Sequence, residues 1–243
     1  MAEIITVVSG KGGVGKSTFC ANIALTLAEK GKTILLIDGD VGLRSLDLLL
    51  SVENQVIYDW SDIVEGRCDK EKAVISCNNN LHLLPAPLEE PEELTKEVFE
   101  NMLGNFRVEY DYVFIDAPAG IGSLPKIYAQ CSDKCIVVAT ADEVSARSAG
   151  IAGNELVKIG VKDENLRLII NRFSHKAVRR GKLLNFDDMI DRTSIRLLGV
   201  VPEDNKLTYA SVTEKPISEF SDTKIAFTNI SDRILGKETP IYL

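Results

Sequence analysis

The amino-acid sequence predicts an α/β protein in which helices cover both faces of a mostly parallel, twisted sheet of seven or eight strands. Three observations indicate this fold class. Short runs rich in β-branched residues alternate along the chain with segments of helical periodicity. The runs at 34–37 and 112–115 are almost wholly apolar, as expected of strands covered on both faces. No repeat or Pro/Gly/Ser-rich linker interrupts the sequence, so we expect one domain over residues 1–243.

Seven segments have the composition of strands. They are residues 4–9, 33–38, 81–84, 112–116, 134–140, 166–171 and 196–201. In a parallel sheet the carboxyl ends of the strands meet at one edge, and ligands bind beyond that edge. Polar residues directly after these segments are therefore the candidates for a functional site.

Four segments have the pattern of helices. The first places Phe19, Ile23 and Leu27 on one face and stops at Gly31. The second begins at Pro91, with acids in its first turn, where the helix dipole favours negative charge. The four predicted helices are 17–30, 91–103, 143–159 and 222–235.

The charge balance limits the classes of partner. A formal net charge of -8 and a pI near 5.0 argue against a broad footprint for nucleic acid, since phosphate binding relies on clustered Lys and Arg. The exception is a short basic cluster at 175–180, which we expect to be a solvated loop. We therefore predict no nucleic-acid partner.

Cysteine usage and hydropathy indicate the compartment. The five cysteines form neither a CxxC pair nor a Cys/His array with zinc spacing, and reduced thiols in a cytosol fit them best. No targeting segment opens the chain, and no apolar run approaches the roughly 18 residues that span a bilayer. We expect a cytoplasmic protein.

The stretch GKGGVGKST at 10–18 fits two nucleotide-binding patterns. Gly10, Gly12 and Gly15 match the GxGxxG turn of a dinucleotide-binding fold. Gly10 and Gly15 with Lys16 and Ser17 match the GxxxxGK[ST] loop that holds a nucleoside triphosphate. Both patterns place the loop between the first strand and its helix, and both accept an acid at the end of the second strand. The glycines alone do not discriminate between them.

Lys16 and Ser17 favour the triphosphate. A triphosphate with Mg²⁺ needs a lysine at its β- and γ-phosphates and a hydroxyl on the metal, directly after the backbone amides that surround the anion. Glycines leave these amides unobstructed, and the helix that follows directs its positive end at the anion. The residues expected to line the phosphate site are Gly10, Gly12, Gly13, Val14, Gly15, Lys16, Ser17 and Thr18.

Three acids follow strands at the same edge of the sheet. Asp116 ends the strand at 112–116 and is expected to hold Mg²⁺ through water, with the loop after it able to sense the γ-phosphate. Asp38 ends the second strand and joins Ser17 and Asp116 in the predicted metal set. Asp40 is free to orient or deprotonate the attacking water, so we predict that it is catalytic.

The base is expected to be adenine. A guanine site usually has an Asn-Lys-x-Asp arrangement, whereas the corresponding strand end reads NRFS from Asn171. Asn171 and Arg172 are the candidates for the adenine edge, and the loop with Pro202 and Asp204 for the other side of the base. The predicted ligands are therefore ATP and Mg²⁺.

These motifs together resemble one family. The loop KGGVGKST with Lys11, DGDVGLRSLD at 38–47, DAPAGI from Asp116, NR at Asn171 and VPED at Val201 are similar to the MinD/ParA family of deviant Walker ATPases, and specifically to its MinD branch. The similarity runs from about residue 4 to 236. It implies a P-loop NTPase fold.

The resemblance also implies a mechanism and partners. Members dimerise face to face around two ATP molecules, with Lys11 of each subunit acting on the partner's phosphates alongside Lys16 and Asp40. Hydrolysis stays weak until an activator of the MinE kind stimulates it, and the ATP dimer at the inner membrane face recruits a division inhibitor of the MinC kind. The implied role is spatial regulation of cell division at the septum site.

Three departures from the family pattern bear on the partners. The segment ILGKETPIYL at 234–243 lacks the basic amphipathic helix of interfacial binding, so we do not expect direct membrane binding through it. Asp142 stands where the family usually has proline, and no acid occurs at 148–150. A ParA-like partition ATPase and an ATP-gated scaffold for a flagellar or pilus apparatus remain as alternatives.

Overall fold

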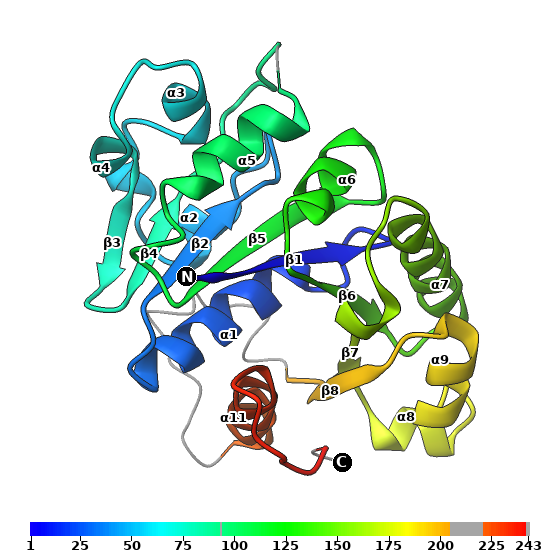
Figure 1. Cartoon of the computed structure of the whole chain (residues 1–243). Coiled ribbons are helices and arrows are strands. Elements are labelled where there is room, and N and C mark those ends of the chain that lie inside the picture. The colour runs from blue at the N-terminus through cyan, green and yellow to red at the C-terminus, as the bar shows by residue number, and fades with distance from the viewer. Residues whose placement is uncertain (93, 205–220, 242–243) are drawn as a thin grey trace.

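The computed structural model describes residues 1–92, 94–204 and 221–241, and eight strands of this part form one sheet (Figure 1). Its strand order is β3-β4-β2-β5-β1-β6-β7-β8. Every neighbouring pair is parallel except β3 with β4. The strands are β1 Glu3–Ser9, β2 Ile34–Asp38, β3 Ile75–Asn78, β4 Leu81–Leu84, β5 Tyr112–Ala119, β6 Lys134–Thr140, β7 Leu166–Phe173 and β8 Leu197–Pro202.

The predicted fold class is confirmed: the chain forms a single α/β domain on a mostly parallel sheet with helices. All seven predicted strands are present: 81–84 and 134–140 have the predicted ends, and the ends of the other five differ by at most three residues. The additional strand is β3, an antiparallel edge strand of four residues that buries only Ile75. One buried side chain leaves no apolar run or alternation to detect, which explains why the sequence did not predict it.

The helices alternate with the strands. Those at 17–30, 143–159 and 222–235 are confirmed within one residue at each end. The helices are α1 Lys16–Glu29, α2 Leu46–Leu49, α3 Trp60–Val64, α4 Lys70–Ala73, α5 Lys96–Gly104, α6 Ser123–Gln130, α7 Glu143–Lys158, α8 His175–Arg179, α9 Phe186–Thr193 and α11 Asp222–Ile234, with 3₁₀ turns Glu53–Gln55 and Asp163–Asn165.

Two predictions about local structure were wrong. The helix expected from Pro91 begins at Lys96, because the Thr95 side chain accepts a hydrogen bond from Val98 N at 3.3 Å and caps the first turn there. Residue 93, inside the predicted helix, lies outside the described residues. The basic cluster expected to be a loop contains the short helix α8, whose cations remain on the surface.

Helices cover both faces of the sheet, and the sheet divides the core into two layers (Figure 1). On one face α1 packs against α11, with Phe19 and Phe227 ring centroids 5.9 Å apart. On the other face α6 packs against β5 and α7 against β6. Burial of large apolar side chains in both layers stabilises the sheet from either side, at about 1.5–3 kcal/mol for each.

The order of the strands brings the predicted site residues to one edge. In the β2–β5 pair Asp38 lies opposite Asp116, and in the β6–β7 pair Thr140 lies opposite Asn171. Strand β1, which leads into the glycine loop, lies between β5 and β6. Among the helices that the structure describes, none is long and apolar enough to cross a membrane.

Candidate functional site

The glycine loop between β1 and α1 fits tightly against its neighbours. Gly13 and Gly15 have φ of 78° and 88°, a left-handed conformation that glycine adopts without strain. A Cβ on Gly10 would lie 2.2 Å from the carbonyl oxygen of Ser148 in α7, so this position excludes any side chain. Gly12 and Gly13 are exposed: a Cβ on Gly13 would meet nothing within 4 Å, and a Cβ on Gly12 would meet only the Ala119 Cβ at 3.8 Å, so the loop has room to receive a ligand.

The start of α1 has the features of an anion site. Gly15 is the residue that precedes the helix, and no side chain caps the first turn. The amide groups of a helix N-terminus and the helix dipole attract negative charge. Ser17 and Thr18, in this first turn, are half-buried. The loop and the helix therefore offer amides and hydroxyls to an anion.

Lys16 and Asp116 form a buried ion pair beneath this loop. The Lys16 Nζ atom lies 2.6 Å from Asp116 Oδ1, and the two side chains are 6% and 0% exposed. Burial alone would lower the pKa of Lys16, but the Asp116 carboxylate raises it above its usual value. The second carboxylate oxygen, Asp116 Oδ2, is buried and has no hydrogen-bond partner. A bare buried oxygen of this kind fits a metal-bound water.

Asp38 organises the loop that follows β2. Its Oδ1 accepts a hydrogen bond from Asp40 N and its Oδ2 from Leu46 N, each at 3.0 Å. Burial and the neighbouring Asp116 charge raise the pKa of Asp38 to about 7. Both oxygens are thus engaged by backbone amides, so contact with an ion would pass through water. Its predicted place in the metal set stays a prediction.

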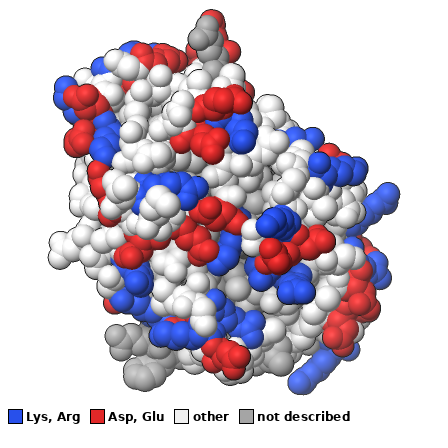
Figure 2. All heavy atoms as spheres, in the orientation of Figure 1, with Lys and Arg blue, Asp and Glu red and all other residues white. Residues whose placement is uncertain are grey.

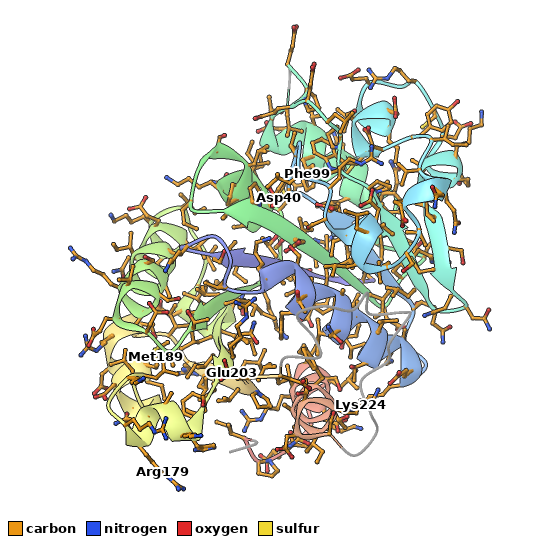
Figure 3. All side chains as sticks on the ribbon, turned by 180° about the vertical axis from the view of Figure 1, so that it is seen from behind. Asp40, Phe99, Arg179, Met189, Glu203 and Lys224 are labelled. Atoms are coloured by element: carbon orange, nitrogen blue, oxygen red, sulfur yellow. The ribbon has the colours of Figure 1, made fainter. Side chains whose placement is uncertain are left out.

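Asp40 lies on the loop after β2, two residues beyond the end of that strand (Figure 3). The Asp40 side chain is only partly exposed, and this burial raises its pKa. The Lys16 charge lowers the pKa of Asp40 and the Asp116 charge raises it further, with a raised pKa as the net result. A carboxylate with a raised pKa accepts a proton more readily near neutral pH. The environment of Asp40 therefore suits the predicted role toward water.

Two aromatic side chains donate hydrogen bonds to the backbone of the segment that leads from β2 to Asp40, and the sequence did not predict them. Trp60 Nε1 donates to the Asp38 carbonyl at 3.0 Å, and the Tyr128 hydroxyl to the Gly39 carbonyl at 3.3 Å. Phe99 lies between the two rings, with centroids 5.9 Å from Trp60 and 4.7 Å from Tyr128. Trp60 is the only tryptophan of the chain, and that is the one sequence signal that could have drawn attention to it.

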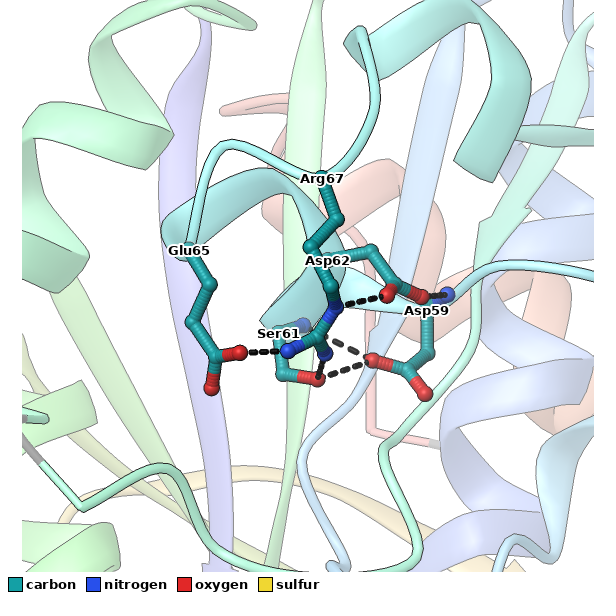
Figure 4. Close-up of polar contacts among 5 residues, drawn as sticks. All are labelled: Asp59, Ser61, Asp62, Glu65 and Arg67. Carbon is teal, nitrogen blue, oxygen red and sulfur yellow. Dashed lines mark hydrogen bonds and ion pairs between the residues drawn. The ribbon is translucent and has the colours of Figure 1, made fainter.

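The position of Trp60 depends on the cap of α3. Asp59 Oδ1 accepts from Ser61 N and Asp62 Oδ2 from Asp59 N, each at 2.9 Å, which is a complete capping box (Figure 4). Arg67 then forms ion pairs with Asp62 and Glu65 across the next turn (Figure 4). These contacts fix the helix start that holds the indole under Asp38.

Asn171 contacts the glycine loop directly. Its buried side chain donates from Nδ2 to the Val14 carbonyl at 2.8 Å, and a Cβ on Gly15 would lie 2.4 Å from the same nitrogen. Arg172 follows with φ of 54°, and its exposed guanidinium lies close to Gly15. The structure therefore brings both residues to the loop, and their contact with a base stays a prediction.

The end of β8 lies beside this region. Phe173 is paired with Pro202 across β7 and β8, and Glu203 N donates to the Phe173 carbonyl at 2.9 Å. Asp204 accepts a hydrogen bond from Thr223 Oγ1 at 3.1 Å, which joins this loop to the start of α11. Pro202 ends β8, one residue later than the sequence predicts, and Asp204 lies in the loop after it. The contact of both residues with a base stays a prediction.

Asp142, at the position where proline is usual, caps α7 and faces Lys11. It accepts hydrogen bonds from Ser145 N at 3.0 Å and Thr140 Oγ1 at 2.6 Å. Burial alone would raise the pKa of Asp142, but these hydrogen bonds and the Lys11 charge hold that pKa below its usual value. The replacement for proline is therefore a working helix cap that also places a negative charge near the exposed Lys11.

The residues at this edge fit Mg²⁺ bound together with a polyphosphate. The Ser17 hydroxyl and the bare Asp116 oxygen are hard oxygen donors of the kind that Mg²⁺ takes, and Mg²⁺ usually keeps several waters and phosphate oxygens as its other ligands. Among the described residues there is no group of three or more His, Cys, Asp or Glu able to hold a metal by themselves. An ion here would thus depend on the nucleotide for its remaining ligands.

Comparisons with known proteins show the family of the chain. A family model of the ParA family, described as a NUBPL iron-transfer P-loop NTPase, matches residues 1–235. The septum site-determining protein MinD of Bacillus subtilis is 37% identical over 250 residues, which cover 99% of this chain and 92% of that protein.

Solved structures share the fold over almost the whole chain. A chain of the MinC:MinD cell division protein complex from Aquifex aeolicus is 34% identical with a TM-score of 0.90, and the match covers 99% of this chain and 98% of that one. The septum site-determining protein MinD of Pyrococcus horikoshii, solved in complex with Mg-ADP, is 26% identical with a TM-score of 0.81, covering 96% of each chain.

Proposed function

The chain belongs to the ParA family of P-loop NTPases, as its motifs predict, and from this premise we propose that it is a MinD-like ATPase that regulates where the cell divides. In this proposal it binds Mg-ATP, dimerises in the ATP state and hydrolyses ATP. The observation that carries the proposal is the buried Lys16–Asp116 pair with one bare carboxylate oxygen, at the start of α1. The ligand in the Pyrococcus horikoshii structure, Mg-ADP, supports the choice of nucleotide and metal.

The glycine loop and α1 hold the phosphates in this proposal. Lys16 leaves Asp116 and donates to the β- and γ-phosphates, while the amides of 10–15 surround the anion. Ser17 would supply a hydroxyl to Mg²⁺, and the bare oxygen of Asp116 would hold a water of the ion. Mg²⁺ at this place would stabilise the negative charge that hydrolysis develops on the phosphates.

Asp40 and Lys11 act in hydrolysis. The raised pKa of Asp40 supports its role in orienting or deprotonating the attacking water. Lys11 is exposed, as a residue that crosses to a partner subunit must be. A cation supplied in trans stabilises charge on the transferred phosphoryl group and makes hydrolysis depend on dimerisation.

The adenine lies between the ends of β7 and β8. Asn171 and Arg172 contact one side of the base, and Pro202 and Asp204 border the other. The Asn171 amide exchanges its Val14 contact for the base, or keeps the loop in place while its oxygen accepts from the base.

Protein partners bind the ATP dimer. Val144 and Ile151 on α7 are 61% and 56% exposed beside Arg147 and Ser148, a mixture of apolar and polar side chains that suits a protein interface. The MinC:MinD complex of Aquifex aeolicus supports an effector of the MinC kind, and an activator of the MinE kind would restart the cycle. The protein would act in the cytoplasm, at or near the inner membrane face.

The distribution of charge disfavours the ParA-like alternative with nucleic acid. Acidic and basic side chains are interspersed over the face in Figure 2, without a continuous basic stripe. Nonspecific nucleic-acid binding depends on clustered cations. A regulator that binds proteins fits this surface better.

Sedimentation velocity with phosphate release tests the proposal. Wild-type protein should be a dimer with Mg-ATP and a monomer with Mg-ADP, and Lys11→Ala should remain monomeric. Asp40→Asn should bind and dimerise but release phosphate at least about a hundredfold more slowly, the range for a lost general base. A monomer under all conditions, or full turnover by Asp40→Asn, would refute this mechanism.

A further inference from the structure

Cys20 shares the buried carboxylate of Asp116 with Lys16. It lies one helical turn after Lys16 on α1, so both side chains face the same edge of the sheet. The Cys20 thiol lies 3.3 Å from Asp116 Oδ1, the oxygen that also accepts from Lys16. Cys20 and Asp116 are both 0% exposed, so no solvent competes for this contact.

The two contacts leave the carboxylate with one engaged and one bare oxygen. Both donors point at Oδ1, while Oδ2 has no partner although it is fully buried. A carboxylate that rotated about its Cβ–Cγ bond would exchange these oxygens. Donors fixed on Oδ1 oppose that rotation, and Oδ2 stays free for a ligand.

If the proposed function is correct, nucleotide binding changes which donors contact Asp116 Oδ1. Lys16 is on a long, flexible side chain and is the group that the phosphates draw away. Cys20 is held by a short side chain on a rigid helix and stays where it is. The thiol then becomes the remaining donor on Oδ1 at the moment when Oδ2 meets a water of the metal ion.

We propose that Cys20 is a positioning residue for magnesium: its thiol holds Oδ1 of Asp116, so that Oδ2 remains directed at the metal site when Lys16 moves to the phosphates. Cys20 itself touches neither the nucleotide nor the ion. The other reading of a buried cysteine, a small apolar core residue, is exemplified by Cys135 in β6. Cys135 is 1% exposed, and the described residues offer it no polar partner.

Substitutions at the two cysteines separate these readings. Cys20→Ala and Cys20→Val remove the donor, and valine also preserves most of the volume. Cys20→Ser keeps an O–H donor in a smaller side chain. Cys135→Ala is the matched control, because it removes a buried thiol that has no carboxylate partner.

Calorimetric titration with ADP measures the effect without turnover. ADP is titrated into each protein in EDTA and at a series of MgCl₂ concentrations, and the MgCl₂ concentration that gives half of the gain in ADP affinity is determined. We expect Cys20→Ala and Cys20→Val to raise this concentration about tenfold, and Cys20→Ser and Cys135→Ala to stay within about a factor of two of wild type. ADP affinity in EDTA should be the same for all five proteins.

Three results would overturn the inference. They are an unchanged magnesium requirement in Cys20→Ala and Cys20→Val, a shift in Cys20→Ser as large as in Cys20→Ala, and an equal shift in Cys135→Ala. Thermal melts of the same samples identify a variant that is not folded, and Cys20→Val and Cys20→Ser then carry the test. Wild-type protein without magnesium-dependent ADP binding would instead refute the proposed function.

Discussion

Lys16 and Asp116, separated by 100 residues in the chain, meet in a buried ion pair with 2.6 Å between Nζ and Oδ1. The pair joins the first helix to β5 in the middle of the sheet. The lysine that is proposed to bind the phosphates is thus paired with the carboxylate that is proposed to hold a water of the metal ion. Folding has already desolvated both charges before a ligand arrives.

Breaking this pair should destabilise the protein strongly. Lys16→Met leaves the Asp116 charge buried without a cation, with only the Cys20 thiol as a hydrogen-bond donor, which costs about 3–5 kcal/mol in the free energy of unfolding. Urea unfolding at pH 8 without nucleotide measures it. The double variant Lys16→Met/Asp116→Asn should recover part of the loss because it removes the orphaned charge. If the double variant is less stable than the single one by the full cost of Asp116→Asn, the two residues do not interact.

Gly10 should not tolerate a methyl group. Gly10→Ala brings its Cβ to 2.2 Å from the Ser148 carbonyl of α7, and the resulting displacement should cost about 1–3 kcal/mol of stability. It should also weaken nucleotide binding, because the loop moves away from its helix. Gly12→Ala is the control, since its Cβ has no neighbour closer than 3.8 Å. Urea unfolding of both variants checks this, and equal stabilities would contradict the packing described.

The hydrogen bond of Trp60 should support hydrolysis more than binding. Trp60→Phe leaves the Asp38 carbonyl without its donor, at a cost of about 1–3 kcal/mol, and loosens the segment that carries Asp40. We expect slower phosphate release with nearly unchanged Mg-ADP affinity. Tyr112→Phe, at a half-buried tyrosine on β5, should change stability by less than about 0.5 kcal/mol. An unchanged rate in Trp60→Phe would show that the indole only fills space.

Asp38 should make the nucleotide-free protein less stable as pH rises. Its pKa is raised from 3.8 to about 7, so its contribution is fully present below pH 3.8 and is lost as pH rises through 7. Asp40, whose pKa is also raised, adds an effect of the same sign. Between pH 5 and 7 the loss from Asp38 should be on the order of 2 kcal/mol. Urea unfolding in EDTA should show this slope, and Asp38→Asn should flatten it; equal slopes in the two proteins would contradict it.

The sequence predicted the interior of the fold because its signal there is local. Continuous apolar runs identified the central strands, and the placement of Lys16 and Ser17 after a strand identified the phosphate loop. The chain belongs to the family of P-loop NTPases that these motifs predict. The sequence did not predict β3, because that strand depends on antiparallel pairing at the edge of the sheet. It also did not predict the start of α5, because both Pro91 and Thr95 can begin a helix and the structure uses Thr95.

The hydrogen bonds that hold the loops of the site could not be predicted from the sequence, because they join residues far apart in the chain. Trp60 reaches Asp38 from 22 residues away, and Asn171 reaches Val14 from 157 residues away. Cys20 could have been found, since it stands four residues after Lys16 on one helical face. No pattern in the sequence indicated that its partner would be Asp116.

The account depends on a polyphosphate with Mg²⁺ at the start of α1. Isothermal titration of wild-type protein with ATP in the presence and absence of Mg²⁺, and separately with NADH, tests this most directly. We predict saturable binding of one ATP per chain that Mg²⁺ strengthens, and no binding of NADH. No heat with Mg-ATP, together with tight binding of NADH, would contradict the central claim.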